Sequence, residues 1–135
     1  MKTRQEALDY GLSFPNTYQE APFHDPNWQL VRVKDSKKVF LWTYERNGFI
    51  NLNVKVSPAW RDFWRDAFPS VIPGWHQNKD NWNTIILDGS IPDDAIKNMI
   101  ADSIEVIDGR VDLDKYGIRI VDDVIYTKTT VEPLT

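Results

Sequence analysis

The sequence predicts an α+β protein with a single, mainly antiparallel sheet and helices on one face of it. Three segments rich in β-forming residues follow one another between Trp28 and Val56, separated by short turns. Such turns join antiparallel strands, whereas parallel strands need longer crossovers. Two amphipathic helical segments lie on either side of a further strand. We therefore expect the order α-β-β-β-α-β-α, followed by a C-terminal β-hairpin.

The first helix is expected at about residues 4–13. Thr3 and Glu6 have the spacing of a capping box, and Pro15 ends the segment. Residues 18–27 contain two prolines and no clear period, so we expect a connecting loop there.

Three strands are expected at residues 28–34, 38–44 and 49–56. Asn47 and Gly48 form the strongest short hairpin signal, because both residues tolerate a positive φ. The third strand alternates, which gives the sheet one dry face under the helices and one polar face that we expect to be open for binding a partner. Its expected inner residues are Ile50, Leu52, Val54 and Val56, and its outer ones are Asn51, Asn53 and Lys55.

Two helices complete the predicted domain. Ser57 and Pro58 begin one helix, and Pro69 ends it. Its aromatic stripe is expected to pack on the sheet. A strand follows at residues 82–87, and a last helix runs from about residue 93 to 107, with Gly109 at its C-terminal cap. The stripe comprises Trp60, Phe63, Trp64, Ala67 and Phe68.

Composition indicates one soluble domain over residues 1–107, with residues 108–135 as an extension that adds a hairpin or edge strands. The chain has 135 residues, 41% hydrophobic and 27% charged, as in ordinary globular proteins. It has no cysteine, which excludes disulfides and thiol catalysis and fits a cytoplasmic location. We expect no membrane span and no secretory signal.

The loop that enters the fourth strand carries the most unusual residues in the chain. It places two tryptophans and a histidine among amides and a lysine. One interpretation is structural, with the amides satisfying loop backbone groups and the tryptophans packing on the sheet. The other is a polar cleft that binds a small anionic ligand by stacking and charge. The ligand-binding candidates are Trp75, His76, Asn78, Lys79, Trp82 and Asn83.

A resemblance adds to this interpretation. The stretch Pro73–Ile85 (Pro-Gly-Trp-His-Gln-Asn-Lys-Asp-Asn-Trp-Asn-Thr-Ile) resembles the signature of MmcQ/YjbR-type proteins, and Lys38–Phe40 and Val54–Pro58 are similar to two further motifs of that family. The similarity covers about residues 1–107. It implies a CyaY-like (frataxin-like) fold and DNA binding, a function attributed to the family largely by fold comparison. It implies no catalytic residues.

Basic side chains near the two hairpin turns are the candidates for binding DNA. Two such turns could contact phosphates like wings. Acidic residues are interleaved with them, and the net charge is −4, so the alternative is an ordinary solvated surface. The nucleic-acid-binding candidates are Lys34, Lys37, Lys38, Arg46, Lys55 and Lys79.

The orientation of the second strand stays open at this point. Either Phe40, Trp42 and Tyr44 pack under the helices, or they form an aromatic platform on the polar face. The platform would suit a protein partner or single-stranded nucleic acid. The other residues of the alternation are Val39, Leu41 and Thr43.

We expect no enzymatic activity. His76 has no neighbouring nucleophile motif, and His24 and His76 lack the short spacing of a metal site. No cofactor and no metal are expected, and the sequence predicts no particular oligomeric state. The predicted partners are DNA, a protein or a small anionic ligand.

Overall fold

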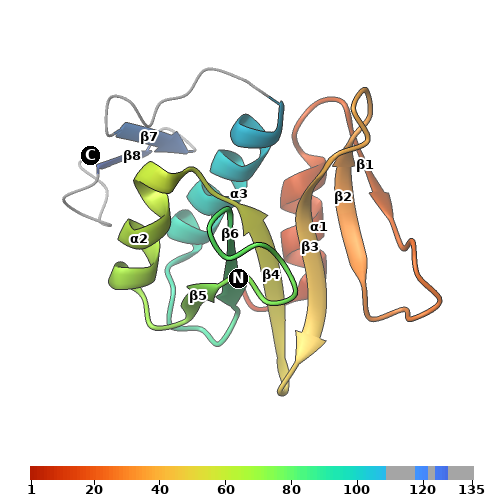
Figure 1. Ribbon diagram of the computed structural model, residues 1–135, viewed down its shortest axis with the longest axis horizontal. Helices are drawn as coiled ribbons and strands as arrows, with labels where there is room; N and C mark the ends of the chain where they lie inside the picture. The colour runs from red at the N-terminus through yellow and green to blue at the C-terminus, as the bar shows by residue number, and fades with distance from the viewer. Residues whose placement is uncertain (109–117, 122–123, 128–135) are drawn as a thin grey trace.

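A six-stranded antiparallel sheet forms the centre of the protein (Figure 1). The computed structural model describes residues 1–108, 118–121 and 124–127. The strand order is β1-β2-β3-β4-β6-β5, and every neighbouring pair is antiparallel. The predicted α+β class is confirmed. The strands are β1 (Thr17–Glu20), β2 (Gln29–Val33), β3 (Val39–Arg46), β4 (Phe49–Lys55), β5 (Val71–Pro73) and β6 (Trp82–Ile86).

The helices pack on the sheet from one side. Helix α1 (Arg4–Leu12) lies against β1, β2 and β3, α3 (Asp93–Asp108) lies against β3 and β4, and α2 (Pro58–Ala67) lies at the β5–β6 end (Figure 1). The predicted capping box of α1 is present, with the Thr3 side chain accepting from Glu6 N and the Glu6 side chain accepting from Thr3 N. The Ser103 hydroxyl joins α3 to the sheet, donating to the Phe40 carbonyl at 2.5 Å and accepting from Lys55 N at 2.9 Å.

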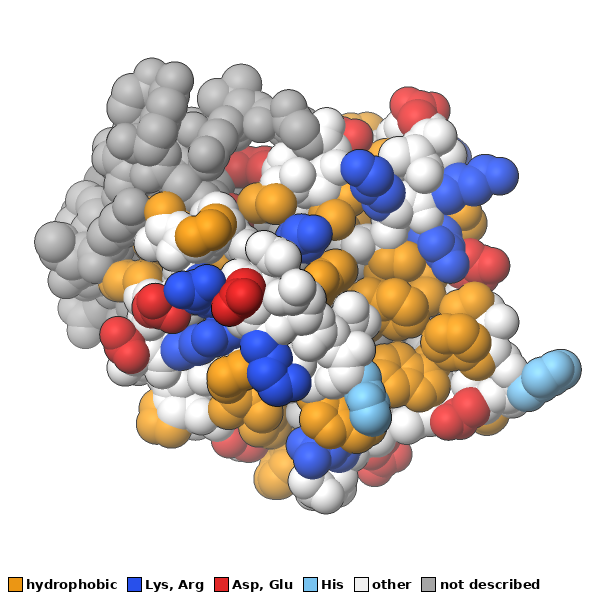
Figure 2. Space-filling model, in the orientation of Figure 1, with side chains coloured by type: hydrophobic (Ala, Val, Ile, Leu, Met, Phe, Trp, Pro, Cys, Tyr) orange, Lys and Arg blue, Asp and Glu red, His pale blue; other side chains and the backbone are white. Residues whose placement is uncertain are grey.

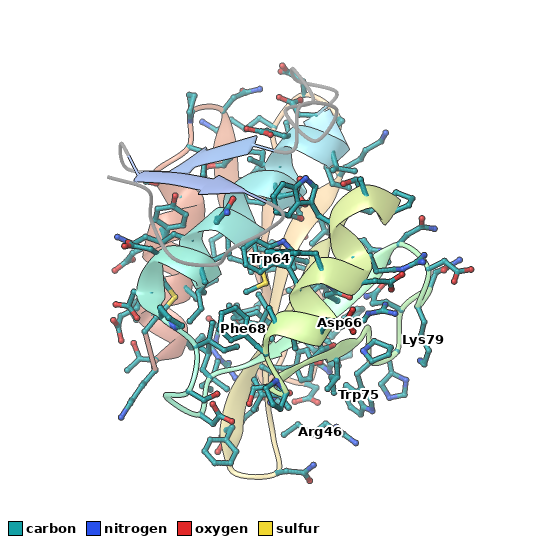
Figure 3. All side chains as sticks on the ribbon, turned by 90° about the vertical axis from the view of Figure 1, so that its left-hand side faces the viewer. Arg46, Trp64, Asp66, Phe68, Trp75 and Lys79 are labelled. Atoms are coloured by element: carbon teal, nitrogen blue, oxygen red, sulfur yellow. The ribbon has the colours of Figure 1, made fainter. Side chains whose placement is uncertain are left out.

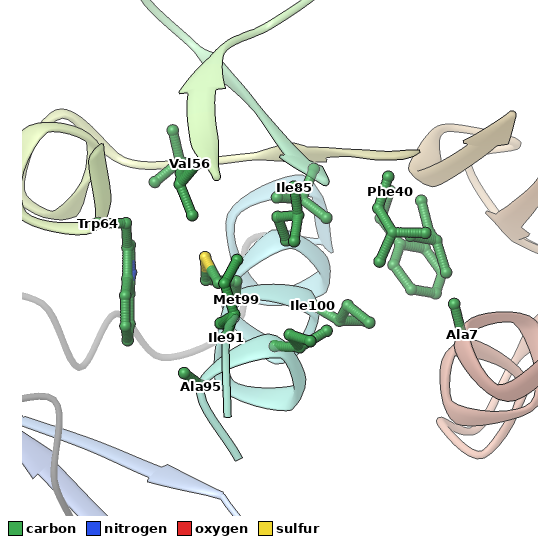
Figure 4. Close-up of a cluster of buried hydrophobic side chains, with 14 of the residues drawn as sticks. Ala7, Phe40, Val56, Trp64, Ile85, Ile91, Ala95, Met99 and Ile100 are labelled. Carbon is green, nitrogen blue, oxygen red and sulfur yellow. The ribbon is translucent and has the colours of Figure 1, made fainter. Parts of the chain in front are cut away.

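The hydrophobic core lies between these helices and the inner face of the sheet (Figure 4). Trp60 and Trp64 of the aromatic stripe are 0% and 1% exposed, so their predicted role in packing is confirmed. Burying aromatic side chains of this size contributes more to the core than any other residue type. The inner residues of β4 also belong to the core, namely Leu52, Val54 and, just beyond the strand, Val56.

Two short strands lie where none was expected. Residues 18–27 were predicted to form a loop, but β1 begins at Thr17 and pairs with β2 from Thr17↔Val33 to Glu20↔Leu30. Strand β5 has three residues and pairs with β6. Both segments are too short to show a period of two, and both lie at the edges of the sheet. Their extended form is stabilised by hydrogen bonds to the neighbouring strand and not by a local pattern.

A β-bulge in β3 answers the question of which face its aromatic residues occupy. Val31 pairs with Leu41 and Arg32 pairs with Val39, so Phe40 is an extra residue between two ladder partners. Phe40 and Leu41 consequently both lie in the core. Beyond the bulge, Trp42 lies on the opposite face. Neither of the two predicted alternations therefore holds along the whole strand.

The predicted C-terminal strands form β7 (Ile118–Val121) and β8 (Val124–Thr127), which pair antiparallel as a second sheet. Strand β7 lies against α3. The predicted cap at Gly109 and the rest of the extension lie outside the described residues. Within the described ranges, none of the helices combines the length and the apolar character needed to cross a membrane.

Candidate functional site

The second face of the sheet is covered at its centre, which corrects the expectation of a fully open polar face. Asn53 on this face is 0% exposed, and Leu30 and Tyr44 are also 0% exposed although they lie outside the core cluster. The segment of residues 74–81 crosses in front of the sheet (Figure 1). The Trp75 ring stacks on Tyr44 with centroids 5.1 Å apart, and the Trp28 ring stacks on Tyr44 at 4.5 Å.

A buried hydrogen-bond network fastens this segment to the sheet. The Asn53 Oδ1 accepts from the Tyr44 hydroxyl at 2.7 Å and from Thr84 Oγ1 at 2.6 Å. The Asn53 Nδ2 donates to the Trp75 carbonyl at 2.8 Å, and Trp75 N donates to Thr84 Oγ1 at 2.9 Å. Burial raises the pKa of the Tyr44 hydroxyl above its ordinary value. The polar residues of this face therefore fix the backbone of Trp75.

Helix α2 holds the other end of the same segment. Arg65 donates to Asn83 Oδ1 at 2.7 Å, to the Trp82 carbonyl at 3.2 Å and to the Lys79 carbonyl. The pKa of Arg65 is lowered, mainly because the guanidinium is partly desolvated. Arg61 donates to the Asp80 carbonyl at 3.1 Å. These two guanidinium groups hold the loop backbone by hydrogen bonds to its carbonyls.

An aromatic pocket of about 230 Å³ opens beside the covered centre. Its rings come from three separate segments of chain and meet at defined angles. The Phe23 and Trp42 rings are near-parallel, 10° apart, with centroids separated by 6.2 Å, and the Trp28 ring is perpendicular to both. We use the name aromatic pocket for Phe23, Trp28, Trp42, His76 and Gln77.

A basic groove of about 390 Å³ continues from the aromatic pocket. The two share the lining residues Trp42 and Gln77, so they adjoin each other. Lys38 is exposed, and the Lys55 Nζ lies 5.5 Å from the centroid of the Trp82 ring. We use the name lysine groove for Lys38, Val39, Trp42, Lys55, Gln77, Trp82, Val106 and Ile107.

A third basic group lies on the other side of the aromatic layer. The Arg46 guanidinium lies 4.5 Å from the centroid of the Trp75 ring (Figure 3). The Trp75 ring is in turn parallel to that of Trp28, with centroids 6.0 Å apart. Figure 2 shows hydrophobic side chains gathered on this face, with Lys and Arg side chains both above and below them. The face thus carries aromatic rings in the middle and cations at both ends.

The structure separates the predicted DNA-binding residues into two groups. Lys34 and Lys37 lie at the β2–β3 turn, whereas Arg46 lies at the β3–β4 turn, at the other end of β3. Strand β3 has eight residues, which at about 3.3 Å per residue places the turns roughly 26 Å apart. The two turns therefore do not form a pair of adjacent wings.

Several predicted ligand-binding residues take part in the protein's own contacts. Lys79 Nζ donates to the Gly74 carbonyl at 3.1 Å, and Asn78 Oδ1 accepts from Asp80 N at 2.8 Å. Asn83 is 0% exposed and bonded to α2. His76 and Trp82 line the depression, in the aromatic pocket and the lysine groove respectively.

Sequence reasoning missed Phe23, Trp28 and Gln77 as parts of this site. The available signal was weak: six tryptophans in a short chain indicate more aromatic surface than one core requires. Phe23 follows Pro22 in a segment expected to be only a connection, yet it is 53% exposed and stacked on Trp42. In the part of the chain that the structure describes, no group of three His, Cys, Asp or Glu side chains is placed to hold a metal ion.

These features define a class of protein: an α+β domain with one antiparallel sheet, helices on one face and an aromatic, cation-flanked surface on the other. The model of the YjbR family matches residues 12–105, and the chain belongs to that family. The resemblance of the Pro73–Ile85 stretch is confirmed.

Relatives and solved structures agree with this assignment. The chain is 30% identical over 98 residues to the uncharacterized protein YjbR of Escherichia coli K12, covering 73% of this chain and 80% of YjbR. It is 28% identical over 105 residues to the uncharacterized protein YbdF of Escherichia coli O157:H7, covering 74% and 86%.

Two crystal structures share the fold. The Deinococcus radiodurans protein DR2400, a DUF419 domain, is 26% identical with a TM-score of 0.73 over 86% of this chain and 87% of DR2400. A Pseudomonas syringae protein is 25% identical with a TM-score of 0.68, covering 77% of this chain and 97% of its own.

Proposed function

We propose that this protein is a non-enzymatic binding domain for single-stranded nucleic acid. The observation that carries the proposal is that the aromatic pocket and the lysine groove adjoin each other at Trp42 and Gln77. Proteins that bind single strands combine rings on which bases stack with cations that follow the phosphates. In duplex DNA the faces of the bases are stacked on one another, so they are not free to stack on the rings of an aromatic pocket.

In this proposal each part of the ligand contacts a different part of the surface. One base enters the aromatic pocket, and its phosphates lie along Lys38 and Lys55. The strand continues over the Trp28 and Trp75 rings toward Arg46. Single-strand binding folds engage about four or more nucleotides each, and the roughly 26 Å length of β3 fits a site of that size.

The net charge of −4 limits how much electrostatic attraction to phosphates contributes to the affinity. An acidic protein that binds through three cations gains less from phosphates than a basic one. For single strands, three phosphate contacts give a slope of log K against log salt of about −2. Stacking supplies the remaining affinity at about 1–3 kcal/mol per base.

The test uses a labelled single-stranded oligonucleotide of roughly eight nucleotides and its duplex, titrated by fluorescence anisotropy over a salt series. We expect the single strand to bind more tightly than the duplex. Lys55→Gln should flatten the salt slope by about 0.7, whereas Lys97→Gln, the same charge change on α3 beside the Tyr10 ring of α1, should leave it unchanged.

A second pair of variants tests the stacking. Phe23 and Phe49 are similarly exposed, at 53% and 46%, but only Phe23 lines the aromatic pocket. Phe23→Ala should weaken single-strand binding about tenfold, as expected for the loss of one stacking surface. Phe49→Ala should leave the affinity unchanged. No binding at low salt, or equal losses in the two variants, would refute the proposal.

The same titration separates the proposal from two alternatives. A mononucleotide that binds as tightly as the oligonucleotide would identify a small-anion site confined to the depression. Binding of the duplex with the steeper slope, unaffected by Phe23→Ala, would identify a phosphate-binding surface that makes no use of the rings.

A further inference from the structure

The lysine groove differs in charge from two other pockets on the described part of the chain. It contains two lysines and no carboxylate. The pocket at the β3–β4 turn also contains two basic residues, but Asp25 and Glu45 lie beside them. The pocket around Lys2 contains Glu45 and Asp88. The lysine groove therefore presents a positive charge that its own lining does not neutralise.

Both ammonium groups of the groove are available to a ligand. Within the described part of the chain, neither Lys38 Nζ nor Lys55 Nζ forms an ion pair or donates a hydrogen bond. In contrast, Lys79 Nζ donates to the Gly74 carbonyl. The Lys55 Nζ lies over the Trp82 ring, which attracts a cation but leaves its charge in place. An anion that enters the groove therefore meets two unpaired positive charges.

The backbone that carries Lys55 is held in place by helix α3. Lys55 N donates to Ser103 Oγ at 2.9 Å, and the same hydroxyl donates to the Phe40 carbonyl at the β-bulge at 2.5 Å. Ser103 is 0% exposed, so these hydrogen bonds are shielded from water. A backbone fixed before binding lowers the cost of ordering the site around a ligand.

The groove lies at one end of the sheet. It contains the last residue of β4, Lys55, and the first residue of β6, Trp82, which pair with each other. Arg46 is the last residue of β3 and lies at the opposite end. The last turn of α3 adds two apolar residues to the groove, Val106 and Ile107, which offer no donor to a phosphate. A single strand that runs along β3 from Arg46 therefore reaches the end of the sheet at the lysine groove.

We infer that the lysine groove binds the terminal phosphate of a single strand, a phosphomonoester, in preference to an internal phosphodiester. The inference rests on the proposed function and deepens it. A phosphomonoester carries a charge of about −1.5 to −2 at pH 7, whereas each internal phosphate carries a single negative charge. Two unpaired ammonium groups in one pocket match the larger charge, and the three free oxygens of the monoester accept hydrogen bonds from both lysines.

The experiment compares three single strands of one sequence, each of roughly eight nucleotides. One carries a 5′-phosphate, one a 3′-phosphate, and one has hydroxyl groups at both ends. Each competes for the protein against the same labelled strand. We expect one of the two phosphorylated strands to bind about tenfold more tightly than the hydroxyl strand, the effect of one additional charge-assisted hydrogen bond. The strand that gains affinity identifies which end of the nucleic acid enters the groove.

Four variants locate the terminal phosphate. Lys38→Gln and Lys55→Gln should each bring the ratio of the two affinities close to one. Arg46→Gln removes the same charge at the opposite end of β3, so it should weaken all strands alike and preserve the ratio. Lys34→Gln, at the β2–β3 turn and outside the lining of the groove, should also preserve the ratio.

The ratio of affinities is the informative readout, because a loss of stability in a variant would weaken all strands alike. Equal binding of the three strands by the unmodified protein would overturn the inference and leave single-strand binding intact. Equal gains from the 5′- and the 3′-phosphate would reflect added charge alone and would also overturn it. A ratio that persists in both groove variants, or that Lys34→Gln removes, would contradict the role of the groove. Failure of every strand to bind would remove the proposed function itself, and the inference with it.

Discussion

The Asn53→Ala substitution is the most direct test of how the sheet shapes the candidate site. It removes one acceptor that receives two hydroxyl hydrogen bonds and one donor that holds the Trp75 carbonyl. A buried hydrogen bond contributes about 1 kcal/mol to stability, and leaving partners unsatisfied adds to the loss. Three such bonds give an expected loss of about 3 kcal/mol in the free energy of unfolding. For a chain of this length that corresponds to a fall in Tm of roughly 10 °C.

Urea unfolding followed by tryptophan fluorescence measures this loss, and near-UV circular dichroism reports on the stacked Trp75 and Tyr44 rings. Both the stability and the aromatic signal should decrease. Asn51→Ala is the control: Asn51 is 2% exposed, but its amide donates only to the Arg46 and Phe49 carbonyls of its own hairpin. It should cost about 1 kcal/mol and leave the aromatic signal intact. A loss below about 1 kcal/mol in Asn53→Ala would refute the reasoning.

Three further predictions concern the same region. In Gly74→Ala the new Cβ would lie 2.7 Å from the Trp82 Cβ, so we expect a loss of about 1–3 kcal/mol from overpacking, measured by thermal unfolding. The pKa of Tyr44 is raised in the folded state, so its contribution to the free energy of unfolding is fully present below the unfolded-state pKa near 10.0 and is lost as pH rises through the folded-state pKa. Tyr44→Phe should therefore lose less stability at alkaline pH than the unmodified protein, as measured by urea titrations at a series of pH values. Arg65→Met removes the bond to the Lys79 carbonyl, so cleavage after Lys79 by a lysine-specific protease should be faster, and an unchanged rate would contradict the role of Arg65.

Local signals in the sequence predicted most elements of the fold. The Thr3–Glu6 capping box, the Asn47–Gly48 turn and the Ser57–Pro58 helix start each act within a few residues, and each is present where expected. The apolar alternation along β4 predicted which of its side chains enter the core. These features depend only on residues that are close in sequence, so they can be predicted from the local sequence pattern.

The candidate site was predictable only in part. The importance of the segment from Pro73 to Ile85 was visible, but Asn83 and Lys79 proved to serve the protein's own contacts. Phe23 and Trp28 reach the site from a connection before β2, and the bulge at Phe40 sets which rings of β3 join them. A bulge depends on the register between two strands, which a single strand's sequence does not encode.

The sequence by itself determined the α+β class, the helices, the hairpins and the family, because capping, turn chemistry and periodicity are local properties of the chain. Only the tertiary structure decided that the polar face is covered at its centre and that its rings and lysines line two adjoining pockets. Those facts depend on contacts between segments far apart in sequence, such as Asn53 with Trp75 and Phe23 with Trp42. Such contacts form only when the whole sheet has assembled.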